Sequence, residues 1–120
     1  MPEESSKPYD LEERTYEFAR DVRQFVRRLP KTISNEEDVR QLIRASGSVG
    51  ANYIEANESL GKKDFLMRAR IARKEAKESR MWLRLLFTDD DTGLEKVRNT
   101  LIAESSELLK ILSAIINNSS

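Results

Sequence analysis

The sequence contains neither cysteine nor histidine among its 120 residues. Without cysteine it cannot form a disulfide framework, a thiol nucleophile or a thiolate metal site. Without histidine it lacks the commonest general base and the commonest transition-metal ligand. Because no other nucleophile is paired with a base, we expect a protein that is not an enzyme, with no metal, no cofactor and no small-molecule substrate.

Glycine (4), proline (3) and aromatic residues (7%) are also scarce, whereas charged residues make up 35% of the chain. This composition favours long amphipathic helices over sheets, since sheets are enriched in β-branched and aromatic residues. The length suits one domain with a single core. We expect a disordered tail over residues 1–9 and one helical domain over 10–118.

Long hydrophobic runs are absent as well. No apolar segment approaches the roughly 20 residues that a membrane span needs. The N-terminal run MPEESSKPYD is polar and acidic, unlike a signal peptide. We therefore expect no membrane association and a cytoplasmic location.

Apolar residues recur at spacings of three and four in four segments, which is the period of a helix face. The first segment carries Leu11, Thr15, Phe18, Val22, Phe25 and Leu29. The second, over about 35–59, carries Val39, Ile43, Ser46, Gly50, Tyr53 and Asn57. The third, over about 62–87, carries Phe65, Ala69, Ala72, Ala76, Ser79 and Leu83. The last carries Leu94, Val97, Leu101, Ser105, Leu108, Leu112 and Ile115.

Helix boundaries are marked by capping residues. The pairs Asp10–Glu13, Ser34–Glu37 and Thr92–Glu95 each have the spacing of a capping box. Pro30 and Gly61 punctuate the intervening turns. Because the loops are only a few residues long, neighbouring helices must run antiparallel, and we predict an all-α, up-down-up-down four-helix bundle.

Basic residues concentrate in residues 62–87, which hold nine Lys or Arg against three acids, a balance of +6 in a chain whose formal net charge is zero. Five of them follow one helix face at spacings of three, four, three and four, and we name them the basic stripe: Arg70, Arg73, Lys77, Arg80 and Arg84. Regularly spaced cations can follow the phosphates of RNA or DNA. The alternatives are a solvated face or ion pairs with the second and fourth helices, whose segments 34–59 and 88–120 each have a net charge of −3.

The same segment has apolar residues outside its core line. We name the apolar sector by its members, Met67, Ile71, Met81, Trp82 and Leu85. A monomeric bundle needs only one buried face on this helix, so a second apolar face predicts another buried contact, of which self-association is the simplest form. The alternative is that Trp82 covers the edge of the bundle while the methionines stay half exposed.

Asp89, Asp90 and Asp91 are three consecutive carboxylates that could hold a divalent cation. They lack the glycine and the distal bidentate glutamate of a calcium-binding loop. We therefore interpret them as a polar turn between helices.

Residues 41–86 resemble the small bacterial four-helix-bundle family of the 23S ribosomal RNA intervening-sequence type. The motif residues that carry the resemblance are Ser48, Asn52, Glu55, Asp64-Phe65, Ile71-Ala72, Glu78 and Leu83. The sequence departs from the family pattern at Ala56, at Gly61-Lys62-Lys63 and at Lys74-Glu75.

The resemblance implies a four-helix bundle that assembles as a ring-like homopentamer and has no catalytic residues. It also implies that Ser48, Asn52 and Glu55 form a subunit contact, and related bundles serve as accessory proteins of retroelement reverse transcriptases, where a basic surface contacts nucleic acid. We therefore expect a homo-oligomeric scaffold or adaptor that contacts RNA or DNA. The alternative is a purely protein-binding module whose basic stripe forms ion pairs between helices or subunits.

Overall fold

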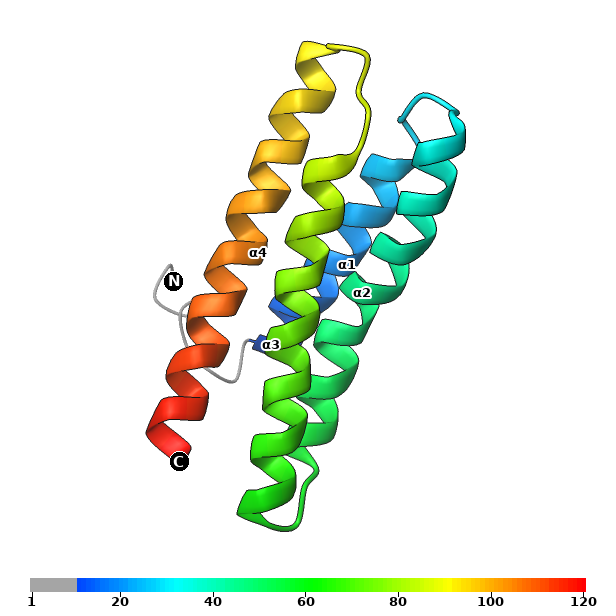
Figure 1. Cartoon of the computed structure of the whole chain (residues 1–120). Coiled ribbons are helices and arrows are strands. Elements are labelled where there is room, and N and C mark those ends of the chain that lie inside the picture. The colour runs from blue at the N-terminus through cyan, green and yellow to red at the C-terminus, as the bar shows by residue number, and fades with distance from the viewer. Residues whose placement is uncertain (1–10) are drawn as a thin grey trace.

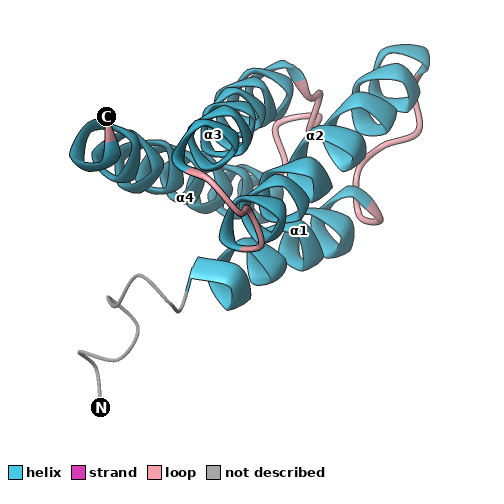
Figure 2. Ribbon diagram, turned by 90° about the horizontal axis from the view of Figure 1, so that it is seen from below, coloured by secondary structure: helices cyan, strands magenta, loops and turns pink. Residues whose placement is uncertain are grey.

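The structure is a computed structural model that describes residues 11–120. It contains α1 (Leu11–Val26), α2 (Ile33–Asn57), α3 (Lys62–Leu85) and α4 (Thr92–Ser119). Successive helices run antiparallel and lie side by side, and α1 also contacts α4, which closes the bundle (Figure 1). Short loops join the helices, with no strand in the described part of the chain (Figure 2). The predicted all-α four-helix bundle is confirmed, whereas the predicted tail over residues 1–9 and the cap at Asp10 lie outside the described residues.

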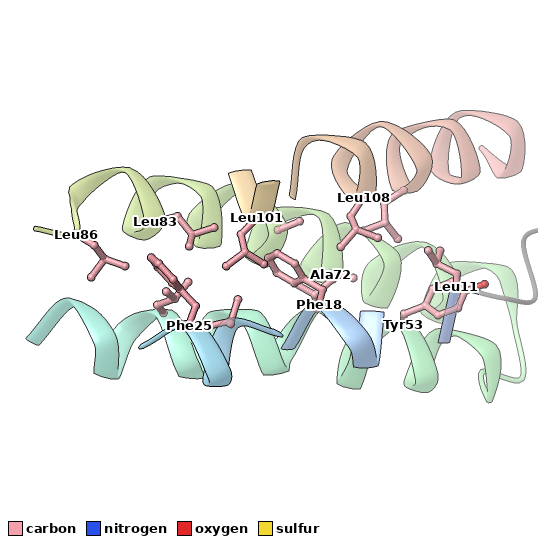
Figure 3. Close-up of a cluster of buried hydrophobic side chains, with 14 of the residues drawn as sticks. Leu11, Phe18, Phe25, Tyr53, Ala72, Leu83, Leu86, Leu101 and Leu108 are labelled. Atoms are coloured by element: carbon pink, nitrogen blue, oxygen red, sulfur yellow. The ribbon is translucent and has the colours of Figure 1, made fainter. Parts of the chain in front are cut away.

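The core runs along the centre of the bundle, and every helix contributes to it. Phe18 of α1, Ala72 of α3 and Leu101 of α4 gather near its middle, each no more than 4% exposed (Figure 3). The predicted line of α1 is confirmed in full, since all six of its residues are buried. The residues of the predicted core lines of α3 and α4 are buried, apart from Phe65, Val97 and Ile115, which are half-buried.

The predicted core line of α2 is partly wrong, because Ile43 is only half-buried and Asn57 is exposed. The helix instead buries Leu42, Ala45, Ser46, Val49, Gly50, Tyr53 and Ala56. This band is wide because α2 packs against both α1 and α3, so its buried face is centred between those two neighbours. Gly50 permits the close approach to α1, since a Cβ at this position would lie 2.9 Å from the Thr15 hydroxyl oxygen.

Two of the predicted helix starts are shifted along the chain. The N-cap of α2 is Thr32, not Ser34, and its side chain accepts a hydrogen bond from the Asn35 amide. The N-cap of α4 is Asp91, not Thr92, and its carboxylate accepts from the Leu94 amide. A short side-chain oxygen satisfies a free amide in both cases, as the capping rule requires, but the residue that supplies it stands one or two positions earlier.

Candidate nucleic-acid and subunit interfaces

The basic stripe lies on the side of α3 that faces α4. Arg70, Lys77 and Arg84 are exposed, while Arg73 and Arg80 are half-buried at the seam between the two helices. Arg80 donates a hydrogen bond across this seam to the Ser106 hydroxyl at 3.1 Å. From Arg70 to Arg84 the stripe extends about 21 Å at the rise of an α-helix.

A shallow hollow beside the stripe runs between α3 and α4, with a volume of about 410 Å³. One wall is lined by Arg70, Arg73, Lys74 and Lys77 of α3, and the other by Leu109 and Ser113 of α4. No carboxylate lines the hollow, so an anion placed there would meet cations on one side and small or apolar groups on the other.

The stripe forms no ion pair with any other residue of the described chain. The ion pairs of residues 11–120 are Arg14–Glu104, Arg20–Asp21, Arg98–Glu95 and Lys110–Glu107. Although α4 contains acidic residues, none of them approaches the stripe within ion-pair distance. The stripe therefore presents its charge to solvent in the single chain.

The apolar sector divides into two parts. Trp82 is half-buried and packs against the core cluster, and Ile71 is also half-buried. Met67, Met81 and Leu85 remain 46%, 44% and 56% exposed on the outer surface of α3. Trp82 thus covers the edge of the core and the two methionines stay half exposed, as the alternative interpretation held, and Leu85 also faces solvent.

The residues predicted as a polar subunit contact lie on α2, at its edge with α3. Asn52 donates hydrogen bonds of 2.9 Å to both the carbonyl oxygen and the hydroxyl of Ser48. Arg68 of α3 donates to the side-chain oxygen of Asn52 at 3.3 Å. Ser48 and Asn52 therefore help to join α2 to α3, whereas Glu55 is exposed and its carboxylate forms no hydrogen bond or ion pair within the part of the chain that the structure describes. The structure places the stripe, the apolar sector and this polar edge on the α2–α3 hairpin.

One ionisable group at this hairpin has an altered pKa. Glu75 of α3 is half-buried, and burial raises the pKa of its carboxyl, with a smaller contribution from the neighbouring charge of Glu78. The nearby Lys74 acts in the opposite direction. An unpaired carboxylate at a helix edge can be neutralised by a cation from outside the chain.

The three aspartates after α3 form a turn, as predicted. Asp89 and Asp90 both have φ of 57°, and Asp91 caps α4. Within residues 11–120 no group of three or more acidic side chains is placed to hold a metal ion. No helix of the same range has the length and hydropathy needed to cross a membrane.

A groove between α1 and α4 was not predicted from the sequence. It has a volume of about 560 Å³, and we name it the acidic groove because four carboxylates line it: Glu13, Glu17, Asp21 and Glu104. The spacing of four between Glu13, Glu17 and Asp21 on the first helix was a signal of one acidic face. The contribution of Glu104 could not be foreseen because it comes from α4, about 90 residues further along the chain.

Comparisons with known proteins agree with this fold. The profile of a family described as 23S rRNA-intervening sequence protein matches residues 8–114. A crystal structure of a protein with unknown function from the S23 ribosomal protein family of Bacteroides thetaiotaomicron has a TM-score of 0.73 and 28% sequence identity to this chain. The match covers 88% of this chain and 96% of the other. No curated protein matches the chain.

Proposed function

This chain belongs to the 23S rRNA-intervening sequence protein family, and we propose that it is a non-enzymatic, homo-oligomeric scaffold or adaptor of the cytoplasm that contacts RNA or DNA through the basic stripe. One observation carries the nucleic-acid part of the proposal. Five cations follow one helix edge, three of them exposed and two half-buried, and none of them forms an ion pair within residues 11–120. A cation without a carboxylate partner is free to replace a counterion on a phosphate.

The stripe has the dimensions of a backbone contact rather than of a base-reading element. Its cations project at about one per helical turn, and one wall of the hollow beside them contains only Leu109 and Ser113. Such a surface can bind phosphates through charge but offers few groups that distinguish one base from another. We therefore expect binding that depends strongly on salt and weakly on sequence.

Self-association is supported by the exposed part of the apolar sector. Met67, Met81 and Leu85 stand on one helix surface, and burying them against another chain would remove apolar area from water. The family resemblance implies a ring of five copies, so we expect light scattering to give five times the chain mass of 13.9 kDa. Met67→Glu combined with Leu85→Glu should lower this mass, because each places a charge in the proposed contact.

The test of nucleic-acid binding is the triple variant Arg73→Glu, Lys77→Glu and Arg80→Glu. Fluorescence anisotropy with a labelled RNA or DNA, titrated at low and high salt, should show affinity falling by at least about tenfold at low salt, with a shallower salt dependence. The matched control is Arg27→Glu, Arg40→Glu and Arg44→Glu, which changes the net charge equally at exposed positions, one directly after α1 and two in α2. Circular dichroism checks that both variants remain folded.

The outcomes separate the two functions considered. An affinity lost only in the stripe variant, with the oligomer intact, supports nucleic-acid contact. Loss of the oligomer without any nucleic-acid binding by the wild type supports the purely protein-binding alternative, in which the stripe forms ion pairs between subunits. Absence of binding by the wild type even at low salt overturns the nucleic-acid proposal.

A further inference from the structure

The acidic groove is a concave surface with an apolar floor and charged rims. Phe18 of α1 and Leu101 of α4 form the floor, and both are almost fully buried. Glu13 and Glu17 stand exposed on the α1 rim. The groove exists because α1 and α4 touch only loosely, whereas α2 and α3 pack closely along their length.

Two of the four carboxylates are already neutralised, and two are not. Arg14 donates to both carboxylate oxygens of Glu104, at 2.6 and 2.9 Å, and Arg20 pairs with Asp21 at 3.1 Å. These contacts raise the pKa of the Arg14 guanidinium, mainly through the hydrogen bond to Glu104. Glu13 and Glu17 form no ion pair with any residue of the described chain. The groove therefore keeps unbalanced negative charge above an apolar floor.

The outermost strip of α3 has the complementary properties. Met67, Lys74 and Met81 are seven residues apart, which places them on nearly one line of the helix. Leu85 follows Met81 by one turn, and Lys63 precedes Met67 by one turn. We name these five residues the outer strip of α3, and all of them are exposed. The strip thus combines three large apolar side chains with two lysines, and the exposed Arg70 and Glu78 flank it on its two sides.

We propose that the acidic groove of one copy receives the outer strip of α3 from a second copy. The inference rests on the proposed self-association and adds which two surfaces meet. A helix laid in a groove buries its apolar residues against the floor while its flanking charges reach the rims. Here Met67, Met81 and Leu85 enter the groove, and Lys63 and Lys74 approach the unpaired carboxylates.

A second copy is the occupant because the outer strip of the same chain cannot reach its own groove. α3 contacts α2 and α4 but not α1, so its outer strip points away from its own groove. The two surfaces are different patches of one molecule, and their contact is therefore heterologous, which leads to a ring or an open chain rather than a two-fold dimer. The basic stripe lies on the α4 side of α3 and stays available for nucleic acid.

The experiment is a charge swap read by light scattering at low salt. A groove variant carries Glu13→Lys and Glu17→Lys, and a strip variant carries Lys63→Glu and Lys74→Glu. Each variant alone brings like charges together, so each should associate at least about tenfold more weakly than the wild type. An equimolar mixture should regain association, because the lysines of one variant then face the carboxylates of the other.

The control is Glu37→Lys with Glu58→Lys, which makes the same charge change as the groove variant at exposed positions in α2 and directly after it, and should associate like the wild type. A groove variant that associates normally overturns this inference but leaves self-association standing. Two weakened variants whose mixture stays dissociated, although circular dichroism shows both folded, also overturn it. A wild type that is monomeric at micromolar concentration overturns self-association itself.

Discussion

The two ends of the bundle are held by different means (Figure 1). At one end the α1–α2 loop meets the α3–α4 loop through Asn35, which is only 2% exposed. Its side-chain amide donates to the carbonyl oxygens of Pro30 and Phe87 at 2.9 and 2.8 Å, and its side-chain oxygen accepts from the Phe87 amide at 2.9 Å. At the other end the α2–α3 loop carries Leu60, which is fully exposed. We name these the clamped end and the open end.

The difference shows which of the loops between helices contribute to the stability of the fold. At the clamped end, one buried side chain forms hydrogen bonds with three backbone groups, which belong to the two loops that meet there. Arg98 adds a hydrogen bond to the Leu86 carbonyl oxygen, and Glu95 accepts from Thr88 and Arg98. At the open end, a Cβ added to Gly61 would meet nothing within 4 Å. Substitutions should therefore be costly at the first end and nearly neutral at the second.

The largest effect is expected for Asn35→Ala. It removes the three hydrogen bonds that this buried side chain makes to the backbone of Pro30 and Phe87, which should lower the free energy of unfolding by about 3 kcal/mol. Urea denaturation followed by circular dichroism measures the change. Asn52→Ala, which loses part-buried hydrogen bonds to Ser48 within α2 and to Arg68 of α3, is the matched control and should cost about 1 kcal/mol. Equal losses in the two variants would show that the clamp has no special role.

A smaller effect is expected for Arg98→Ala. Loss of the hydrogen bond to the Leu86 carbonyl should cost about 1 kcal/mol at neutral pH. The hydrogen bond from Arg98 lowers the pKa of Glu95, with a further contribution from Thr88. Because the pKa of Glu95 is lower in the folded state, its ionised carboxylate stabilises the fold at pH values above 4.5, the ordinary pKa. This contribution is lost as the pH falls through the folded-state pKa and the carboxylate becomes protonated. The stability difference between wild type and variant should therefore shrink below pH 4.5, and a difference that grows in acid would contradict this assignment.

Asp90→Gly should stabilise the clamped end slightly. Asp90 has φ of 57°, in the left-handed region that glycine adopts without steric cost. We expect a gain of about 0.5 kcal/mol, measured as a rise in the thermal midpoint. Asp38→Gly, inside α2, should give the opposite sign, since glycine lowers helix stability there. A loss of stability in Asp90→Gly would mean that the carboxylate itself supports the turn.

The smallest effect is expected for Leu60→Ser at the open end. An exposed loop side chain contributes little, so the free energy of unfolding should change by less than about 0.5 kcal/mol. The same urea titration measures it. A loss comparable to that of Asn35→Ala would remove the distinction between the two ends.

These comparisons also show what could be predicted from the sequence. The core line of α1 was correct at every position because one run of spacings three and four defines its buried side. Ile43 and Asn57 were misplaced because the buried face of α2 depends on two neighbours. The role of Asn35 could not be foreseen, since its partner Phe87 lies 52 residues further along the chain.

The candidate surfaces also differ in how far the sequence alone could locate them. The basic stripe and the apolar sector could be located because each lies on one helix, where spacing alone determines the face. The acidic groove could not, because Glu13 and Glu104 come from opposite ends of the chain and meet only when α1 lies beside α4. A surface formed by one helix can thus be predicted from the sequence. A surface shared by helices that are distant in the sequence can be located only once the fold is known.

The uneven distribution of charge over a neutral chain determines how this molecule interacts at a distance. Twenty-one basic and twenty-one acidic residues cancel, yet the stripe faces solvent beside α4 while unpaired carboxylates occupy the α1 rim. Such a molecule has a dipole moment but no monopole, and at physiological salt its field is screened within about 8 Å. A polyanion further away experiences almost no attraction, so capture begins only after rotational diffusion has turned the stripe toward it. Orientation therefore precedes binding at physiological salt, and the encounter rate should rise at low salt, where the field of the stripe extends further.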